Sequence, residues 1–142
     1  MKKIHVAFCA DVNYFPYLGV VLKSIVNCSS REFEYVIYVV HDGVDCLSEG
    51  MLRSEIKSAQ NFSLKMIDVR ECEHLLSGVY VSRYITTAAY WRILLPLLLP
   101  GVEKVLYLDV DTVVLDDAAA FFTSPMFAAF VSTSPFGSSN LI

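Results

Sequence analysis

Almost continuous apolar runs recur along the chain and predict the strands of a buried sheet. Ile4–Ala10 and Tyr35–Val40 are rich in β-branched residues and show little alternation, which is typical of parallel strands covered on both faces. Phe62–Val69 and Val105–Leu108 have the same character and predict two further strands, and Phe127–Val131 predicts a fifth.

Amphipathic segments between these runs predict helices. Over Tyr14–Val26 the apolar residues recur at steps of three and four, which indicates a helix with one buried stripe. Ser48 is a suitable N-cap for a second helix that extends to Gln60, with Met51, Ile56 and Ala59 as its inward positions. Shorter helical segments are expected at Glu71–Leu76, Thr87–Leu95 and Asp116–Phe122. The alternation of strands and helices predicts one α/β domain over residues 1–142 with a mostly parallel sheet flanked by helices.

The amino-acid composition and the net charge exclude some structural and functional classes of protein. Hydrophobic residues make up 55% of the chain and charged residues 18%, which excludes intrinsic disorder. The net charge of −4 provides no basic excess to neutralise phosphates, so we expect no nucleic-acid partner. The four cysteines form no C-x-x-C pattern and are expected to be reduced and mostly buried.

No segment has the features of a membrane span or a secretion signal. The most hydrophobic segment, Ile93–Val102, is too short to cross a bilayer and contains two prolines. His5 and Asp11 interrupt the stretch after the N-terminal lysines, and no small-residue cleavage site follows. We therefore expect a cytoplasmic protein, either free or peripheral at the inner face of the membrane. The uncharged segment Ala118–Ile142 predicts that the chain is incomplete at this end or that a partner covers it, with self-association as one option.

An acidic pair, Asp109 and Asp111, follows the strand predicted at Val105–Leu108. On an extended backbone the two carboxylates point to the same side and Val110 faces the core. Paired carboxylates are hard oxygen ligands suited to Mg²⁺ or Mn²⁺. The alternative is that both side chains lie in a turn and face water.

Polar residues also follow the first predicted strand, at the edge where open α/β sheets bind ligands. Asp11 and Asn13 can hydrogen-bond a base or ribose, and Tyr14 can stack on a base; the alternative is an ordinary helix N-cap. Arg92 is the single charge in its apolar stretch and needs an anion or water, and a structural salt bridge is the alternative to a ligand. His41 follows the second strand, and a surface turn is its simplest interpretation.

Several enzyme classes are disfavoured by missing patterns. The chain has no G-x-G-x-x-G and no G-x-x-x-x-G-K-[ST], which argues against a dinucleotide-dependent dehydrogenase and a P-loop enzyme. A Mg²⁺-dependent response-regulator-like or phosphatase-like domain is also disfavoured, because the acidic pair comes late in the chain.

Three segments in the same order and spacing resemble glycosyltransferase family 8: FCADVNYFPYLGVVLKSI, ITTAAYWRILLPLLLP and KVLYLDVDTVVLDD. This family includes bacterial galactosyl- and glucosyltransferases of lipopolysaccharide or capsule synthesis, and the glycogenins. The resemblance extends from Ile4 to about Val131. It implies a GT-A fold, which is a Rossmann-like nucleotide-binding sandwich. It also implies transfer of a hexose from a UDP-sugar to a glycan or lipid-linked glycan acceptor, with retention at the anomeric carbon.

The resemblance also assigns roles to individual residues. It implies that Asp109 and Asp111 form a DxD motif that holds Mn²⁺, or Mg²⁺ in its place. It places Asp11 and Asn13 at the uridine, Tyr14 at the uracil, Arg92 at the sugar or diphosphate, and Cys9, Ala10 and Val110 among the other nucleotide-sugar-binding residues. Family members are longer than this chain, and a third metal ligand, a histidine, lies in their C-terminal half. The competing hypothesis is therefore a catalytically incomplete module that binds only a nucleotide or a partner.

Overall fold

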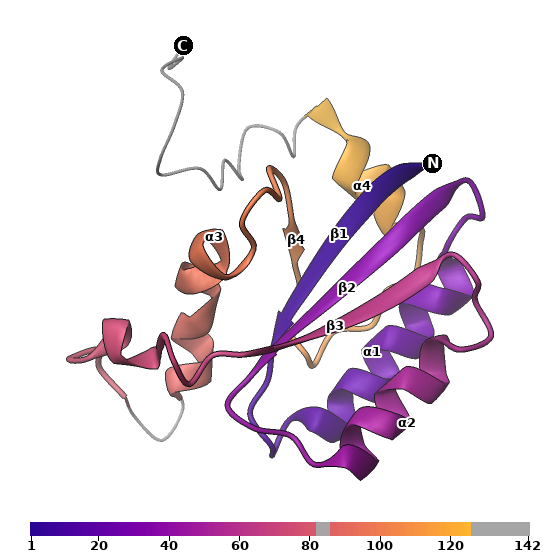
Figure 1. Cartoon of the computed structure of the whole chain (residues 1–142). Coiled ribbons are helices and arrows are strands. Elements are labelled where there is room, and N and C mark those ends of the chain that lie inside the picture. The colour runs from indigo at the N-terminus through magenta and orange to yellow at the C-terminus, as the bar shows by residue number, and fades with distance from the viewer. Residues whose placement is uncertain (82–85, 126–142) are drawn as a thin grey trace.

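A computed structural model describes residues 1–81 and 86–125, so the strand expected at Phe127–Val131 lies outside the described residues. Its centre is a four-stranded sheet with the order β3-β2-β1-β4 (Figure 1). The strands are β1 (Lys2–Cys9), β2 (Phe33–His41), β3 (Phe62–Asp68) and β4 (Leu106–Tyr107). All three neighbouring pairs are parallel, which confirms the predicted sheet.

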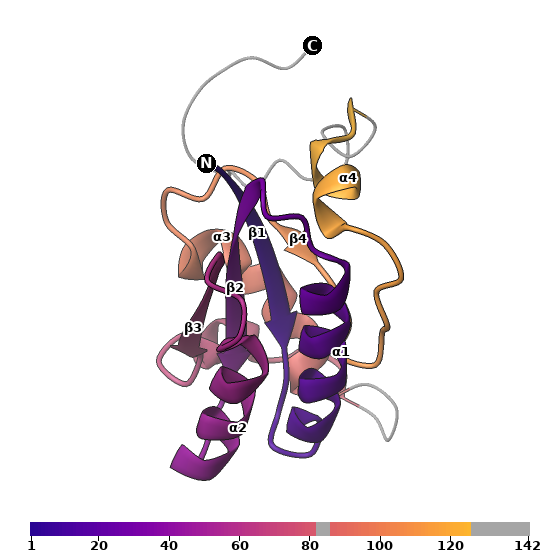
Figure 2. The same cartoon turned by 90° about the vertical axis from the view of Figure 1, so that its right-hand side faces the viewer.

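Helices cover both faces of the sheet (Figures 1 and 2). One face carries α1 (Phe15–Cys28), α2 (Cys46–Ile56) and α4 (Ala118–Thr123), and the other carries the 3₁₀ helices η1 (Glu73–Leu76) and η2 (Thr87–Leu94) with α3 (Leu95–Leu98). Because successive side chains of a strand point to opposite faces, β1 contributes to both cores. Ile4, Val6 and Phe8 pack toward α1, whereas Ala7 and Cys9 pack toward η2 and α3.

The first helix agrees with its sequence pattern, and the second differs in its boundaries. In α2 the N-cap is Asp45, not Ser48: its carboxylate accepts hydrogen bonds from the backbone amides of Leu47 and Ser48, both at 2.9 Å. The helix ends at Ile56, before Gln60. Its buried residues are Leu52 and Ile56, Met51 is exposed, and Ala59 lies beyond the helix.

Two other elements are shorter or tighter than expected. β4 has only two residues, because its ladder with β1 pairs only Leu106 and Tyr107. The segment expected to be helical at Thr87–Leu95 forms η2 and then the single turn of α3, which begins just before Pro96. No helix within residues 1–81 and 86–125 is long and apolar enough to cross a membrane. The four cysteines are free, with Cys9 buried and Cys46 exposed.

The strand order determines where a ligand can bind. From β1 the chain moves outward to β2 and β3 on one side, and it then crosses over to place β4 on the other side of β1. The order therefore reverses between β1 and β4. In open α/β sheets, ligands bind beyond the carboxyl ends of the strands at such a reversal point. The residues that follow Cys9 and Tyr107 occupy this position.

Candidate functional site at the carboxyl ends of β1 and β4

The last residue of β1 and the loop that follows it contribute five of the residues singled out in the sequence. Cys9 and Ala10 are buried, and the Ala10 amide donates to the Val40 carbonyl at 3.0 Å, which continues the sheet pairing by one residue. Asp11 Oδ1 accepts a hydrogen bond from the Asn13 amide at 2.9 Å and closes a tight turn.

Neither Asp11 nor Asn13 caps α1, so the N-cap alternative is wrong. The N-cap position belongs to Tyr14, whose side chain makes no capping hydrogen bond. Tyr14 is 42% exposed and lies beside Tyr17, with ring centroids 5.9 Å apart. Asn13 is also exposed. The loop thus presents an amide and an aromatic ring to solvent at the carboxyl edge.

The acidic pair lies in a turn, and the expectation of an extended backbone is wrong. The Leu108 amide still donates to the Ala7 carbonyl at 3.1 Å, but beyond it the Thr112 amide and hydroxyl bond back to the Asp109 carbonyl at 3.3 and 2.7 Å. The backbone bends here because the pairing of β4 with β1 has ended. Val110 faces the core as expected, whereas Asp109 and Asp111 are exposed.

Arg92 approaches the same edge from η2. Its guanidinium carbon lies 5.6 Å from the ring centroid of Tyr107, a cation–π distance. The Tyr107 hydroxyl in turn donates to Asp109 Oδ1 at 3.0 Å. Sequence reasoning missed Tyr107. The strand alternation that was used for Asp109 and Asp111 could have found it, since positions 107 and 109 are two residues apart.

The buried groups at this site are neutral at physiological pH. Burial raises the pKa of the Cys9 thiol to about 12, with Arg92 lowering it and Asp109 raising it by smaller amounts. Burial likewise raises the pKa of the Tyr107 hydroxyl, and so do Cys9 and the hydrogen bond to Asp109. Cys9 is therefore a packing residue rather than a thiolate nucleophile.

The donor chemistry at the turn fits a hard divalent cation that shares its coordination with a phosphate ligand. Asp109 and Asp111 supply exposed carboxylate oxygens, and such ions are often held by one or two carboxylates plus substrate phosphates. Among the described residues, no group of three histidine, cysteine or acidic side chains is placed to hold a metal. A complete protein cage is thus not found within this part of the chain.

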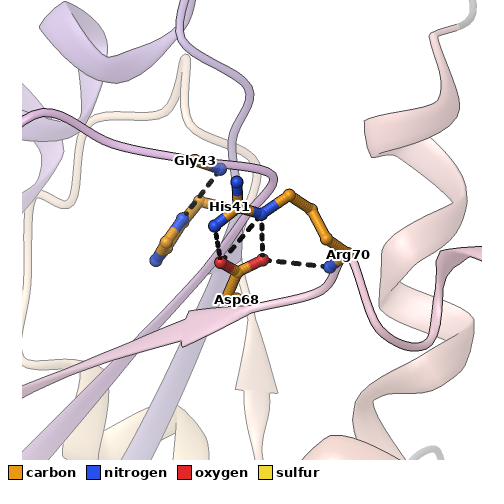
Figure 3. Close-up of polar contacts among 4 residues, drawn as sticks. All are labelled: His41, Gly43, Asp68 and Arg70. Atoms are coloured by element: carbon orange, nitrogen blue, oxygen red, sulfur yellow. Dashed lines mark hydrogen bonds and ion pairs between the residues drawn. The ribbon is translucent and has the colours of Figure 1, made fainter.

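A second polar cluster lies at the carboxyl ends of β2 and β3 (Figure 3). His41 is buried, not part of a surface turn as expected, and its Nδ1 accepts the Gly43 amide at 3.1 Å. Asp68 accepts hydrogen bonds from the Arg70 backbone amide at 3.0 Å and from Nε at 2.9 Å, and the two side chains form an ion pair. Each of these contacts lies within one loop, and the Val69 amide, which donates to the His41 carbonyl at 2.8 Å, joins the two segments.

The chain is similar to known proteins both in sequence and in fold. The sequence profile described as glycosyl transferase family 8 matches residues 5–137. The chain belongs to glycosyl transferase family 8. General stress protein A of Bacillus subtilis (strain 168) is 30% identical over 117 residues, which cover 80% of this chain and 40% of that protein. This family 8 chain therefore spans less than half the length of that relative.

Solved glycosyltransferases share the fold. The bifunctional glycosyltransferase WbbM in its apo form has a TM-score of 0.74 and 25% identity, over 87% of this chain and 21% of that one. The galactosyltransferase LgtC, solved with donor and acceptor sugar analogues, has a TM-score of 0.70 and 23% identity, over 87% of this chain and 43% of that one. These likenesses confirm the GT-A fold expected for the family 8 chain.

Proposed function

We propose that this chain forms the nucleotide-sugar-binding part of a retaining hexosyltransferase that uses a UDP-sugar donor. One observation carries the proposal. The fold brings Cys9 and Ala10, the acidic turn at Asp109–Asp111 and Arg92 to the reversal point between β1 and β4. Family membership supports the same reaction class. The acceptor in this proposal is a glycan or lipid-linked glycan, such as a lipopolysaccharide or capsule precursor.

Each element at the edge has a separate role in this proposal. Asp11 and Asn13 hydrogen-bond the uridine, and the exposed ring of Tyr14 lies against the uracil. Cys9 and Ala10 limit the depth of the base pocket through their small buried side chains. Val110 fixes the acidic turn by packing into the core.

Asp109 and Asp111 would hold Mn²⁺ or Mg²⁺, which when bound stabilises negative charge on the diphosphate of the departing UDP. Arg92 is exposed and rests on the ring of Tyr107, so its guanidinium is available to a phosphate oxygen or the sugar. The acceptor hydroxyl would attack from the face that UDP leaves, which retains the anomeric configuration.

A second candidate is a module that binds a nucleotide or a partner without sugar transfer. It is favoured by the lack, within residues 1–81 and 86–125, of a group of three side chains suited to a metal. Two acidic ligands can suffice for binding a nucleotide, whereas catalysis requires the leaving group to be held in a defined geometry.

Calorimetric titration of the chain with UDP, with and without MnCl₂, tests the nucleotide site. We expect binding that strengthens with Mn²⁺ and loses that dependence in Asp111→Asn. Asp42→Asn is the matched control, because it removes an exposed carboxylate at the same edge of the sheet. Equal metal dependence in Asp111→Asn and wild type would contradict the proposed role of the acidic turn.

Release of UDP from UDP-glucose and UDP-galactose, measured with and without a glycan acceptor, separates the two candidates. Acceptor-stimulated release supports the transferase. Metal-dependent UDP binding with no release supports the binding module.

A further inference from the structure

We propose that Tyr107 is a positioning residue of the nucleotide-sugar site: its hydroxyl orients the carboxylate of Asp109, and its ring holds the guanidinium of Arg92. The inference rests on the function proposed above, and it concerns a residue that neither the motif spacing nor the family assignment singled out. It is carried by two contacts of one side chain, a hydrogen bond made by its hydroxyl and a cation–π contact made by its ring.

The sheet fixes the position of the Tyr107 ring. Tyr107 is the last residue of β4, its register partner in β1 is Ala7, and its half-buried side chain packs against the core on the η2 and α3 face. A side chain that is anchored in a sheet and a core has few alternative rotamers. The ring is therefore a rigid platform next to a turn whose acidic side chains are exposed.

The hydrogen bond from the Tyr107 hydroxyl gives the carboxylates of Asp109 and Asp111 different freedom to rotate. Asp109 Oδ1 is engaged at 3.0 Å by Tyr107, which leaves Oδ2 for a ligand and restricts rotation of the side chain. Within the described residues Asp111 accepts no hydrogen bond of this kind and keeps its rotational freedom. Asp109 is thus the oriented ligand of the pair, and Asp111 is the one that adapts.

The ring contact keeps Arg92 available to an anion. The guanidinium carbon lies 5.6 Å from the ring centroid, and among the described residues no ion pair joins Arg92 to Asp109. A cation–π contact holds the guanidinium without neutralising its charge, so Arg92 can still pair with an anion. Tyr107 therefore contacts both of the opposite charges that the proposed site needs to use on different parts of one ligand.

The test compares Tyr107→Phe with Tyr38→Phe. Tyr38 is a matched control because it lies on the same face of the sheet and its hydroxyl also makes one side-chain hydrogen bond, to His5 Nδ1 at 3.0 Å. Three quantities are measured for each variant: the Kd of UDP with Mn²⁺, the Kd of uridine without metal, and the melting temperature.

We expect Tyr107→Phe to weaken metal-dependent UDP binding by about tenfold, as is usual when a partner of a metal ligand is removed. Uridine binding should stay within about twofold of wild type, because uridine has no phosphate to engage the acidic turn or Arg92. Tyr38→Phe should change neither affinity. This split separates positioning from a general structural role, which would weaken uridine and UDP alike.

Unchanged or tighter UDP binding with Mn²⁺ in Tyr107→Phe would overturn the inference while leaving the proposed function standing. Parallel loss of uridine and UDP binding would also overturn it, in favour of a purely structural role. If the folded wild-type chain shows no metal-dependent UDP binding, the proposed function and this inference fail together.

Discussion

The hydroxyl of Tyr35 connects the segment after the acidic turn to the sheet. We expect its removal to lower the free energy of unfolding by a measurable amount. Tyr35 is fully buried in β2, with its ring stacked on Phe62 at a centroid distance of 4.7 Å. Its hydroxyl donates to Asp117 Oδ1 at 2.5 Å and accepts the Ser30 amide at 3.2 Å. Asp117 also accepts the amides of Ser30 and Ala119, the latter as the N-cap of α4.

Tyr35→Phe removes one hydroxyl and keeps the stacked ring. The lost hydrogen bond reaches a carboxylate in a partly buried site, and bonds of this type contribute about 1.5–3 kcal/mol. The other donors to Asp117 remain, so we expect a loss of about 2 kcal/mol in the free energy of unfolding. For a chain of this size, the melting temperature should fall by about 4–8 °C.

Urea unfolding followed by circular dichroism measures this change. Tyr90→Phe is the control, because its hydroxyl donates to the Tyr80 carbonyl at 2.8 Å in an exposed setting, and it should cost about 0.5 kcal/mol or less. A double-mutant cycle of Tyr35→Phe with Asp117→Ala should show a coupling above about 1 kcal/mol. A loss of stability in Tyr35→Phe no larger than that in Tyr90→Phe would show that the hydrogen bond to Asp117 does not stabilise the fold.

Three further predictions concern residues at the carboxyl ends of β2 and β3 and in the loops that follow them. Asp45→Ala should cost about 1 kcal/mol in urea unfolding, because α2 loses its N-cap, and an unchanged midpoint would contradict this assignment. Hydrogen bonds from Arg70 lower the pKa of Asp68 to about 2, so its stabilisation is present above pH about 4 and is lost as the pH falls toward 2. Because the pair is exposed, the difference between wild type and Asp68→Asn across that range should stay below about 1 kcal/mol. Burial lowers the pKa of His41, so folding stability should fall as the pH drops below about 6.5, and an NMR titration of its ring should give a pKa below that value. A His41 pKa above about 6.5 would be inconsistent with the buried, neutral ring.

The sequence predicted the strands well because burial on both faces of a parallel sheet leaves a strong local signal. Ile4–Ala10 and Tyr35–Val40 correspond to β1 and β2, and both are buried over most of their length. The start of α2 was misplaced because Asp45 and Ser48 are both good N-cap residues. Only the backbone decides between them, and Ser48 in fact donates its hydroxyl to Asp45 at 2.6 Å.

The site was predicted less completely, because its geometry depends on where strand pairing stops. Asp109 and Asp111 were correctly placed after a strand, but nothing local shows that β4 ends at Tyr107 and that a turn follows. The buried state of His41 was missed for a similar reason, since it depends on the contacts that Phe15 and neighbouring loops make with its ring. Tyr107 and Arg92 come together only through the crossover from η2 to β4.

Locating the bound metal and nucleotide on the protein tests whether the nucleotide site lies between β1 and β4. An NMR spectrum of the isotope-labelled chain with UDP and a substoichiometric amount of Mn²⁺ reports it, because the ion broadens nearby signals. We predict selective broadening at Cys9, Arg92 and Asp109, with sharp signals at Phe33 and Phe62 on the amino edge of the sheet. Broadening centred on the amino edge, or spread evenly over the chain, would contradict a nucleotide site between β1 and β4.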